Sequence, residues 1–339
     1  MGISGGVDSA VAAMILRDEG REVRGVWLRM TPEQDGEGEV RAVSDWLGIT
    51  LDVLDLVGLF REEVLGPVAT AYSAGRTPNP CVLCNPTVKL AALVARADAL
   101  GIEHVATGHY VRVRKTREGP VLLRGADLAK DQSYFLSMVP PEILVRMVFP
   151  LGEGTKGETR RRAGAVELAV ADAPESQETC FAGSGRLGDF LEMTCGLVPR
   201  PGPVVLEDGR EIGRHRGIHR FTVGQRRGLG IPWQHPLHVL RLEPDEDRLV
   251  VGRREAMDAA GLVAKGVRWG SGGIPAAGTA LLIKIRYRSP AAPCRIVNAD
   301  EQGFRVSFEK PLTAVTPGQA AVLYDGEQVA GAGWIEGAV

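Results

Sequence analysis

The chain has 339 residues, of which 44% are hydrophobic and 24% charged, and its formal net charge is −2 at pH 7. This composition is typical of a globular protein of two or three domains, and it excludes a collagen-like or strongly charged disordered chain. We see no apolar run of membrane-spanning length and no secretory leader, and we therefore expect a cytoplasmic protein without membrane contact.

The first element predicted along the chain is a glycine loop, residues 4–9 (SGGVDS), that opens directly into a helix. Val11, Met14 and Ile15 share one face of that helix, and Gly20 stands where a C-terminal cap is expected. Unpaired N–H groups and the helix dipole favour an anion at such a loop. The loop lacks the spacing and the lysine of the Walker pattern, which disfavours an ordinary phosphate-cleaving NTPase. The alternative is a glycine turn that only caps a structural helix.

Very little chain precedes this loop. A phosphate loop is expected to follow a buried strand, but only residues 1–3 (MGI) come before Ser4. We therefore expect either a start placed too late or a sheet weakened at its centre.

Short apolar runs and helical patterns then alternate as far as Leu191. Strands are predicted at 22–28, 51–56 and 104–107, and helices at 40–47 and 88–100. Such alternation is typical of βαβ units with a mostly parallel sheet, and ligands of these sheets bind at the carboxyl ends of the strands. We predict an α/β, Rossmann-like domain over residues 1–192.

The composition changes after this domain. Pro199, Pro201 and Pro203 and many glycines predict a small, loop-rich module over residues 193–260. Residues 210–228 hold six arginines against one acid and predict a local basic surface, in which we interpret His215 and His219 as solvated. Runs rich in β-branched and aromatic residues at 281–287, 304–308 and 320–324 predict a C-terminal antiparallel β-barrel over 261–339, with a sandwich as the alternative.

The cysteines point to thiol or metal chemistry. There are five, an odd number spread over a long chain, which does not resemble a secreted disulfide framework. Cys81 and Cys84 stand before a predicted helix, whose N-terminus favours thiolate; alone, they are compatible with a zinc half-site, a redox pair or iron–sulfur ligands. Structural zinc is disfavoured because Cys180 and Cys195 lack the spacing of a second pair. We expect Cys195 and Cys294 to be small buried hydrophobes.

Several motifs occur together in one order along the chain. They are residues 2–9 (GISGGVDS), 77–85 (TPNPCVLCN), 106–110 (ATGHY), 130–136 (KDQSYFL), 176–181 (SQETCF), 222–230 (TVGQRRGLG), 285–288 (IRYR) and 317–319 (PGQ). This combination closely resembles the tRNA-specific 2-thiouridylases, called MnmA or TrmU, of the PP-loop ATP pyrophosphatase superfamily. The resemblance runs over nearly the whole chain.

The resemblance implies a reaction in two steps on the wobble uridine of tRNA. ATP, with Mg²⁺, first adenylates the 2-carbonyl oxygen of the uracil, and a persulfide sulfur then replaces that oxygen. The implied partners are tRNA and a persulfide-donating protein.

The matching motifs also imply roles for individual residues. Cys180 would carry the persulfide, and Cys84 would attack it and close a transient Cys84–Cys180 disulfide. The ATP contacts would come from Gly2, Ile3, Ser4, Gly5, Gly6, Val7, Asp8, Ser9, Met30 and Gly108, although Met30 is equally compatible with a core position. The target base would be lined by Asn79, Pro80 and Cys81, and tRNA would touch His109, Lys130, Asp131, Gln132, Arg286, Tyr287 and Gln319.

Some alternatives stay open at this point. Some relatives carry Asp where this chain has Cys81, and three thiols, Cys81, Cys84 and Cys180, are enough to hold an iron–sulfur cluster with one iron left open. We favour the persulfide relay because Cys180 lies on a separate loop. A small-molecule adenylating ligase shares the glycine loop but has no use for paired reactive cysteines, and a chain that only binds RNA would not consume ATP.

Overall fold

The computed structural model describes residues 1–34, 36–166, 168 and 187–339, and the chain forms two compact units. The first unit comprises Met1–Val64, Cys81–Phe181 and Glu327–Val329; the second comprises Leu65–Pro80, Ala182–Gly326 and Ala330–Val339. The units are interleaved in sequence. The expected motif at 176–181, with Cys180, lies outside the described residues.

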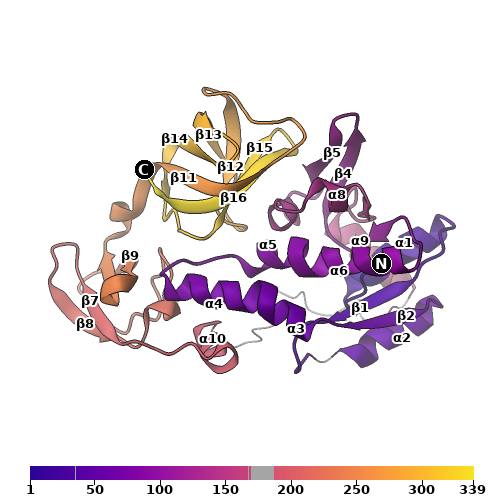
Figure 1. Ribbon diagram of the computed structural model, residues 1–339, viewed down its shortest axis with the longest axis horizontal. Coiled ribbons are helices and arrows are strands. Elements are labelled where there is room, and N and C mark those ends of the chain that lie inside the picture. The colour runs from indigo at the N-terminus through magenta and orange to yellow at the C-terminus, as the bar shows by residue number, and fades with distance from the viewer. Residues whose placement is uncertain (35, 167, 169–186) are drawn as a thin grey trace. The chain divides into compact units, whose positions relative to one another are not determined.

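A parallel sheet forms the centre of the first unit (Figure 1). Strand β1 (Gly25–Arg29) pairs in parallel with β2 (Leu51–Asp55), and β3 (Val105–Ala106) pairs in parallel with β6 (Met147–Val148). The predicted strands at 51–56 and 104–107 are confirmed within a residue or two, whereas the strand predicted at 22–28 begins later, at Gly25.

The residues that precede the glycine loop join the two halves of this sheet. Val26 N donates to Met1 O at 2.8 Å and Ile3 N donates to Val26 O at 2.9 Å, while Gly2 N donates to Ala106 O at 2.9 Å on the other side. The spatial order is therefore β2, β1, residues 1–3, β3, β6. The strand order reverses between residues 1–3 and β3, which is where open α/β sheets bind ligands.

Helices cover both faces of the sheet. Helices α1 (Val7–Asp18), α2 (Glu37–Leu47) and α9 (Lys156–Ala165) bury Ile3 and Trp27 on one face, and Leu93 of α6 (Leu90–Ala99) lies against Gly2 on the other. The helices predicted after the loop, at 40–47 and at 88–100, are confirmed. These packed layers hold the loop rigidly at the end of a short strand.

Shorter elements complete the first unit and its borders. A hairpin of β4 (Val111–Thr116) and β5 (Gly119–Arg124) lies between β3 and β6 in sequence. The short helical segments are α3 (Val57–Phe60), η1 (Arg61–Leu65), α4 (Gly66–Ser73), α5 (Pro80–Cys84), η2 (Asn85–Lys89), α7 (Ser133–Leu136) and α8 (Pro141–Leu144). Because α5, η2 and α6 follow one another without a break, Cys81 lies in the first turn of one long helical stretch, and Cys84 lies about one turn further along it.

Besides α4, the second unit contains α10 (Leu187–Cys195) and a four-stranded sheet in the order β8, β7, β10, β9. Its strands are β7 (Gly202–Val205), β8 (Glu211–His215), β9 (His238–Glu243) and β10 (Arg248–Gly252), accompanied by η3 (Ile218–Arg220), η4 (Pro244–Glu246) and η5 (Arg254–Met257).

The interpretation of two histidines of this unit as solvated is wrong. His215 and His219 are both buried. His215 Nε2 lies 2.7 Å from Asp247 O, and His219 Nε2 lies 2.6 Å from a carboxylate oxygen of Glu192. Arg220 pairs with Glu192 and with Asp189 of α10, so this arginine of the expected basic stretch is occupied by acids from a preceding helix.

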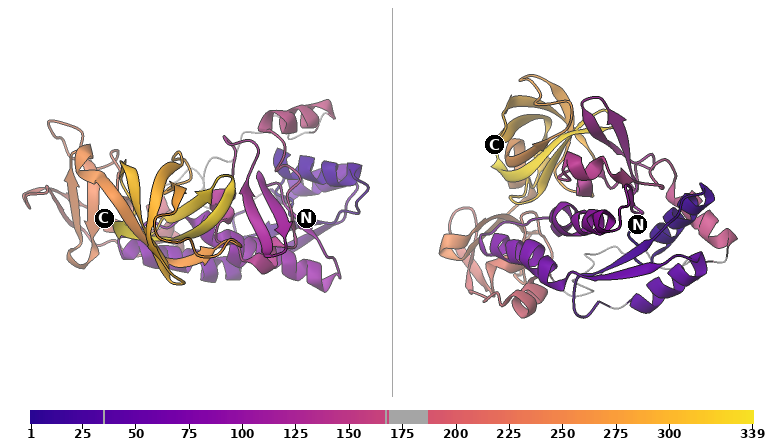
Figure 2. Two further views of the ribbon diagram at one scale, coloured as in Figure 1. Left: turned by 90° about the horizontal axis from the view of Figure 1, so that it is seen from above. Right: turned by 45° about the vertical axis from the view of Figure 1, so that its right-hand side comes forward.

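The C-terminal strands close into an antiparallel barrel, as predicted (Figure 2). Its strands are β11 (Asp258–Trp269), β12 (Ala280–Lys284), β13 (Ala292–Ala299), β14 (Gly303–Thr313), β15 (Ala320–Asp325) and β16 (Gln328–Ala338). Strand β11 pairs with both β14 and β16, which closes the barrel. The strand predicted at 281–287 ends at Lys284, because the chain then turns, with Ser289 N donating to Arg286 O.

The barrel interior contains Cys294, which is 1% exposed. Burial raises the pKa of this thiol to about 12, helped by the negative charge of Glu309. The expectation of a small buried hydrophobe is therefore confirmed for Cys294 but wrong for Cys195, which is only half-buried at the end of α10.

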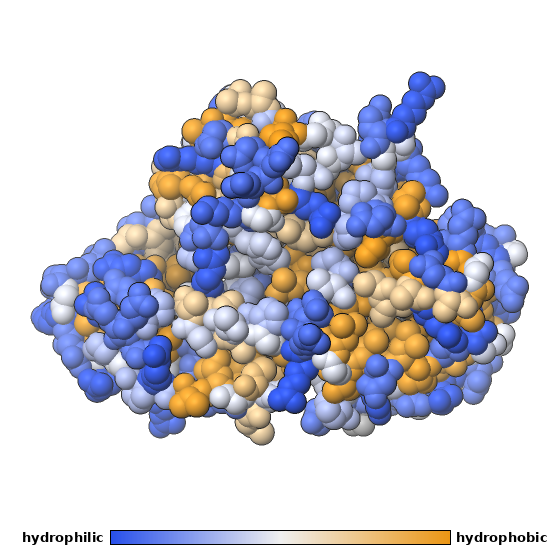
Figure 3. Space-filling view, viewed as in Figure 1, coloured by the Kyte–Doolittle hydropathy of each residue, from blue (hydrophilic) through white to orange (hydrophobic). Residues whose placement is uncertain are grey.

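The surface of the first unit carries apolar side chains near β2. Val53 of β2 and Leu59 of α3 are exposed, and Figure 3 shows hydrophobic residues gathered over β1, β2 and α3. Within the ranges that the structure describes, no helix is both long and apolar enough to cross a membrane.

Asp52 links β2 to two neighbouring elements. Both of its carboxylate oxygens accept hydrogen bonds from Arg24, at 2.8 Å each, and Oδ2 also accepts one from Arg96 of α6 at 2.9 Å. The side chain is only 13% exposed. The hydrogen bonds from Arg24 and Arg96 hold the pKa of the Asp52 carboxyl well below its usual range.

We expect Asp52→Asn to lower the free energy of unfolding by roughly 2 kcal/mol at neutral pH, because hydrogen bonds to a charged group are lost. The folded pKa lies below the unfolded value of about 3.9, so the contribution is complete above about pH 4 and declines as the pH falls toward the folded pKa. Urea unfolding of wild type and Asp52→Asn at neutral pH and near pH 3 measures this contribution. Exposed Glu22→Gln is the control. A difference between wild type and Asp52→Asn that does not shrink in acid would contradict this account.

Candidate active site

The glycine loop lies at the N-terminus of α1, where the first N–H groups of the helix have no partner within the helix. The first intrahelical bond runs from Ala10 N to Gly6 O, so the N–H groups of residues 7–9 are not used within the helix. Gly5 has a φ of +77°, a conformation that glycine adopts without strain. Ser9 Oγ donates to Gly6 O at 3.0 Å and accepts from Ser4 N at 3.1 Å, which fixes the curve of the loop. This arrangement suits an oxyanion such as phosphate.

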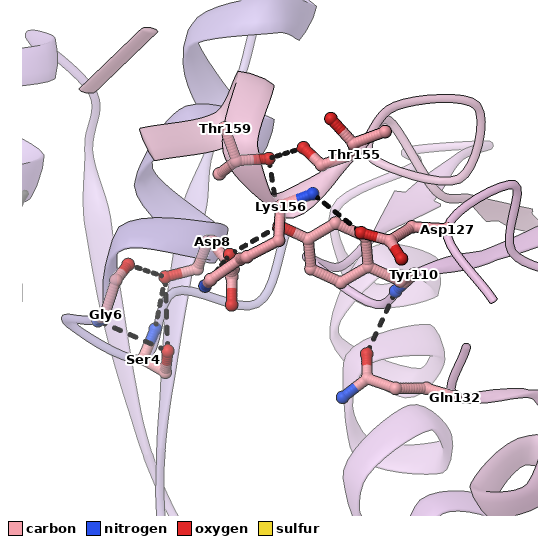
Figure 4. Close-up of polar contacts among 10 residues, drawn as sticks. Ser4, Gly6, Asp8, Tyr110, Asp127, Gln132, Thr155, Lys156 and Thr159 are labelled. Atoms are coloured by element: carbon pink, nitrogen blue, oxygen red, sulfur yellow. Dashed lines mark hydrogen bonds and ion pairs between the residues drawn. The ribbon is translucent and has the colours of Figure 1, made fainter. Parts of the chain in front are cut away.

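Asp8, in the same loop, is held by two donors on one oxygen (Figure 4). Lys156 Nζ lies 2.6 Å from Asp8 Oδ1, and the Tyr110 hydroxyl lies 2.8 Å from the same oxygen and 2.9 Å from Thr159 Oγ1. The Lys156 side chain is only 10% exposed, whereas that of Asp8 is 37% exposed. Burial, with the nearby Asp8 carboxylate, raises the pKa of Tyr110, so this hydroxyl keeps its proton.

Lys156 owes its position to the start of α9. Thr155 is the N-cap of this helix and forms a capping box with Glu158, whose backbone N–H donates to the Thr155 hydroxyl. Lys156 N also donates to Asp127 Oδ2 at 3.1 Å. Lys156, Tyr110 and Thr159 were not predicted as site residues from the sequence. The Thr-x-x-Glu pattern was a readable signal for the helix start, but not for where the lysine points.

The segment after β3 lies against the glycine loop. A Cβ on Gly108 would stand 2.9 Å from Asp8 C and from Ser9 N, so only glycine allows the two backbones to approach this closely. His109 Nδ1 lies 2.8 Å from Thr107 Oγ1, and its ring packs edge-on against Phe149. Burial, and then the charge of Lys89, lowers the pKa of His109 to about 3.

The expected tRNA contacts at residues 130–132 have internal partners. Asp131 is almost fully buried and accepts hydrogen bonds from Arg124, Gly125 N and the amide and hydroxyl of Ser133. Gln132 Oε1 accepts from Tyr110 N at 2.9 Å. Lys130 N donates to Asp127 O. These bonds tie the 130–132 turn to Tyr110 and so to Asp8.

Met30 and Cys84 meet in the first unit. Met30 follows β1 and is buried, and its backbone N–H donates a hydrogen bond to Gln34 Oε1 at 2.7 Å. The Cys84 thiol lies 3.9 Å from Met30 Sδ and is 6% exposed. Cys81, one helical turn away, is half-buried. The structure thus brings one expected ATP residue into contact with one expected catalytic thiol.

The remaining expected residues belong to the second unit. Asn79 and Pro80 are covalently continuous with Cys81. Gln319 Nε2 donates to Thr77 O at 2.7 Å. Arg286 donates to Ala314 O and lies 3.4 Å from Thr316 Oγ1, and the ring of Tyr287 lies beneath Lys284 Nζ, 5.5 Å from its centroid.

Three family models match successive parts of the chain. They are the tRNA methyl transferase HUP domain over residues 1–184, the tRNA methyl transferase PRC-barrel domain over 188–253 and the aminomethyltransferase beta-barrel domain over 259–335. The tRNA-specific 2-thiouridylase MnmA of Syntrophotalea carbinolica is 42% identical over 341 residues, covering 98% of this chain and 97% of the relative. That of Desulforudis audaxviator is 42% identical over 339 residues, covering 99% and 98%. The chain belongs to the MnmA family.

The described side chains form no cluster that is typical of a protein metal site. Within residues 1–34, 36–166, 168 and 187–339, no group of three or more His, Cys, Asp or Glu is arranged to hold a metal ion. Cys180, the third expected thiol, lies outside those residues. The Lys156 and Tyr110 contacts both use Asp8 Oδ1, and the second carboxylate oxygen, Oδ2, is the kind of ligand that suits a hard cation accompanying phosphates.

We expect His109 to stay neutral from pH 8 down to about pH 5, because its folded pKa lies far below the unfolded value of about 6.5. As the pH falls below that unfolded value, the unfolded chain binds a proton that the folded chain does not. Wild type should therefore lose up to about 1.4 kcal/mol of stability per pH unit relative to His109→Gln.

Denaturant unfolding of both proteins between pH 7 and 5 measures this loss, with exposed His104→Gln as the control. An NMR signal of the His109 ring that titrates above pH 5 would show that the imidazole becomes charged.

Proposed function

We propose that this chain catalyses the ATP-dependent 2-thiolation of the wobble uridine of tRNA. One observation carries the proposal: a phosphate loop at the switch point of the sheet lies in a chain that is 42% identical, over 98% of its length, to a tRNA-specific 2-thiouridylase. Paired cysteines beside the same sheet edge support sulfur chemistry over a small-molecule adenylating ligase, which needs no thiol.

The first step is adenylation of the base. The 2-carbonyl oxygen of uracil attacks the α-phosphorus of ATP, forming an O–P bond, and the bond from that phosphorus to the pyrophosphate oxygen breaks. The N–H groups of residues 7–9 and the Lys156 ammonium would bind the phosphates. Mg²⁺, held through Asp8, would neutralise phosphate charge. Met30 and Gly108 would flank the nucleotide.

The second step transfers sulfur. The Cys84 thiolate attacks the Cys180 sulfur of the persulfide, so that a Cys84–Cys180 disulfide forms and the terminal sulfur leaves with the electron pair. That sulfur attacks C2 of the adenylated base, and AMP departs with the former carbonyl oxygen. The thiols are oxidised as the sulfane sulfur is reduced, and a dithiol reductant restores them before the next turnover. Asn79, Pro80 and Cys81 would line the base.

An iron–sulfur route would use Cys81, Cys84 and Cys180 as ligands. Of these three, Cys81 and Cys84 belong to the described residues, and the Cys84 thiol lies 3.9 Å from Met30 Sδ. We derive no step through a cluster. Iron and sulfide analysis of anaerobically purified protein distinguishes the two routes.

The decisive experiment is nucleoside mass spectrometry of unmodified tRNA after incubation with the protein, ATP, Mg²⁺ and a persulfide-donating desulfurase. We expect uridine to gain the mass of a sulfur-for-oxygen exchange, and Cys180→Ser to abolish the gain while tRNA binding persists. Ser271→Ala, on a turn of the second unit, is the control. A methyl-sized gain would support the transferase class that the family models name, and no gain with intact tRNA binding would support a chain that only binds RNA.

We expect Lys156 to affect the rate of adenylation but not the rate of sulfur transfer. We expect Lys156→Met to slow tRNA-dependent pyrophosphate release by about 100-fold, because a positioned positive charge on the developing leaving group is removed. Lys115→Met, at the exposed tip of the β4–β5 hairpin, is the matched control. Thermal unfolding checks that the fold survives, and Lys156→Arg should recover part of the rate. Undiminished pyrophosphate release in Lys156→Met would remove the lysine from the mechanism.

A further inference from the structure

A loop of the barrel holds the backbone of Thr77. Thr77 N donates to Pro317 O at 2.8 Å, and Thr77 O accepts from Gln319 Nε2 at 2.7 Å. Both main-chain polar groups of this residue are therefore bonded to residues 317–319. All of these residues belong to the second unit.

The contact is close enough to require glycine between the two bonding residues. Gly318 has a φ of +91°, and a Cβ there would stand 2.8 Å from Thr77 N and 3.1 Å from Pro78 N. The loop is in turn tied to β16, because Gly318 N donates to Ile335 O and Ile335 N donates to Gln319 O. Thr77 thus rests on a loop that the barrel wall fixes.

The Thr77 side chain and its neighbour are held as well. Thr77 Oγ1 lies 3.3 Å from Thr222 Oγ1, in the motif at 222–230, and Thr77 is almost fully buried. Arg76 donates to Ile335 O at 3.1 Å and pairs with Glu336 at 2.8 Å. Segments from both the central module and the barrel converge on residues 76–77.

The chain after Thr77 transmits this position to the helix that carries the thiols. Pro78 and Pro80 each have a fixed φ, which leaves residues 78–80 little freedom to absorb a shift. Helix α5 begins at Pro80 and includes Cys81 and Cys84. A displacement of Thr77 would therefore move the start of α5.

We infer that Gln319 is a positioning residue that acts through Thr77: the barrel loop at 317–319 sets the place of Asn79 and Pro80, the part of the expected lining of the target base that belongs to the same unit. This inference rests on the proposed function and deepens it, because it gives the C-terminal barrel a role in forming the base pocket. A Gln319 that instead touches tRNA would leave Thr77 undisturbed when it is replaced.

Gln319→Met tests the inference, because methionine keeps the length of the side chain and removes the amide donor. We expect amide hydrogen exchange in the peptide containing Thr77, Asn79 and Cys81 to speed up by about fivefold, the factor that corresponds to one intramolecular hydrogen bond. The kcat for thiolation at saturating tRNA should fall by a similar factor, and tRNA affinity by less than about twofold. Gln302→Met, on an exposed turn of the same barrel, should change none of these.

Two outcomes would overturn the inference. Unchanged exchange at residues 77–81 would show that Gln319 does not hold this segment, and weaker tRNA binding with unchanged kcat would show a direct tRNA contact. Hydrogen exchange is measured without substrate turnover. A wild-type protein that does not thiolate tRNA would therefore contradict the proposed function without deciding whether Gln319 holds Thr77. If Gln319→Met does not fold, Thr77→Val removes only the bond to Thr222 and should increase exchange at Asn79 and Cys81; unchanged exchange there would count against the inference.

Discussion

The ion pair between Asp8 and Lys156 is the constraint around which the first unit is arranged. A phosphate loop without a lysine of its own concentrates negative charge at the end of a helix once a nucleotide binds, and that charge needs a fixed cation nearby. We propose that Lys156, which stands 148 residues after Asp8 in the chain, supplies this cation. Its side chain is only 10% exposed, and its Nζ lies 2.6 Å from Asp8 Oδ1. The Tyr110 hydroxyl on the same carboxylate oxygen fixes the geometry of the pair.

The surrounding hydrogen bonds follow from that requirement. The capping box of Thr155 and Glu158 fixes the first turn of α9, and the Asp127 carboxylate accepts a hydrogen bond from the backbone N–H of Lys156. Gln132 holds the backbone of Tyr110. The turn at 130–132, which carries three of the expected tRNA contacts, is thus part of the support of the phosphate site. An RNA that bound this turn would act on the groups that position Asp8.

The sequence predicted what depends on local pattern. The helix after the loop, its cap at Gly20, the alternation of strands and helices and the C-terminal barrel all follow from periodicity and turn residues. The contact between Lys156 and Asp8 does not, because nothing local in a capping box specifies a partner so distant in sequence. The error at His215 and His219 has a similar cause. An arginine-rich stretch is normally interpreted as solvated, and the local sequence does not show that acids on α10 and the carbonyl of Asp247 bind its side chains.

The interleaving of the two units was also beyond local pattern, and so was the contact between the Cys84 thiol and Met30. The carboxyl ends of parallel strands meet at one edge of a sheet, so the residues after the first strand, after β1 and after β3 gather there: Ser4, Met30 and Thr107 with Gly108. Other adenylating enzymes with such a loop need nothing more at this edge than a substrate. Here the helical stretch from Pro80 brings Cys84 to Met30, at the end of β1. A thiol has no role in activating a carbonyl with ATP, but it has one in releasing sulfur to the activated carbon, and this contact is what favours sulfur transfer over other uses of the same loop.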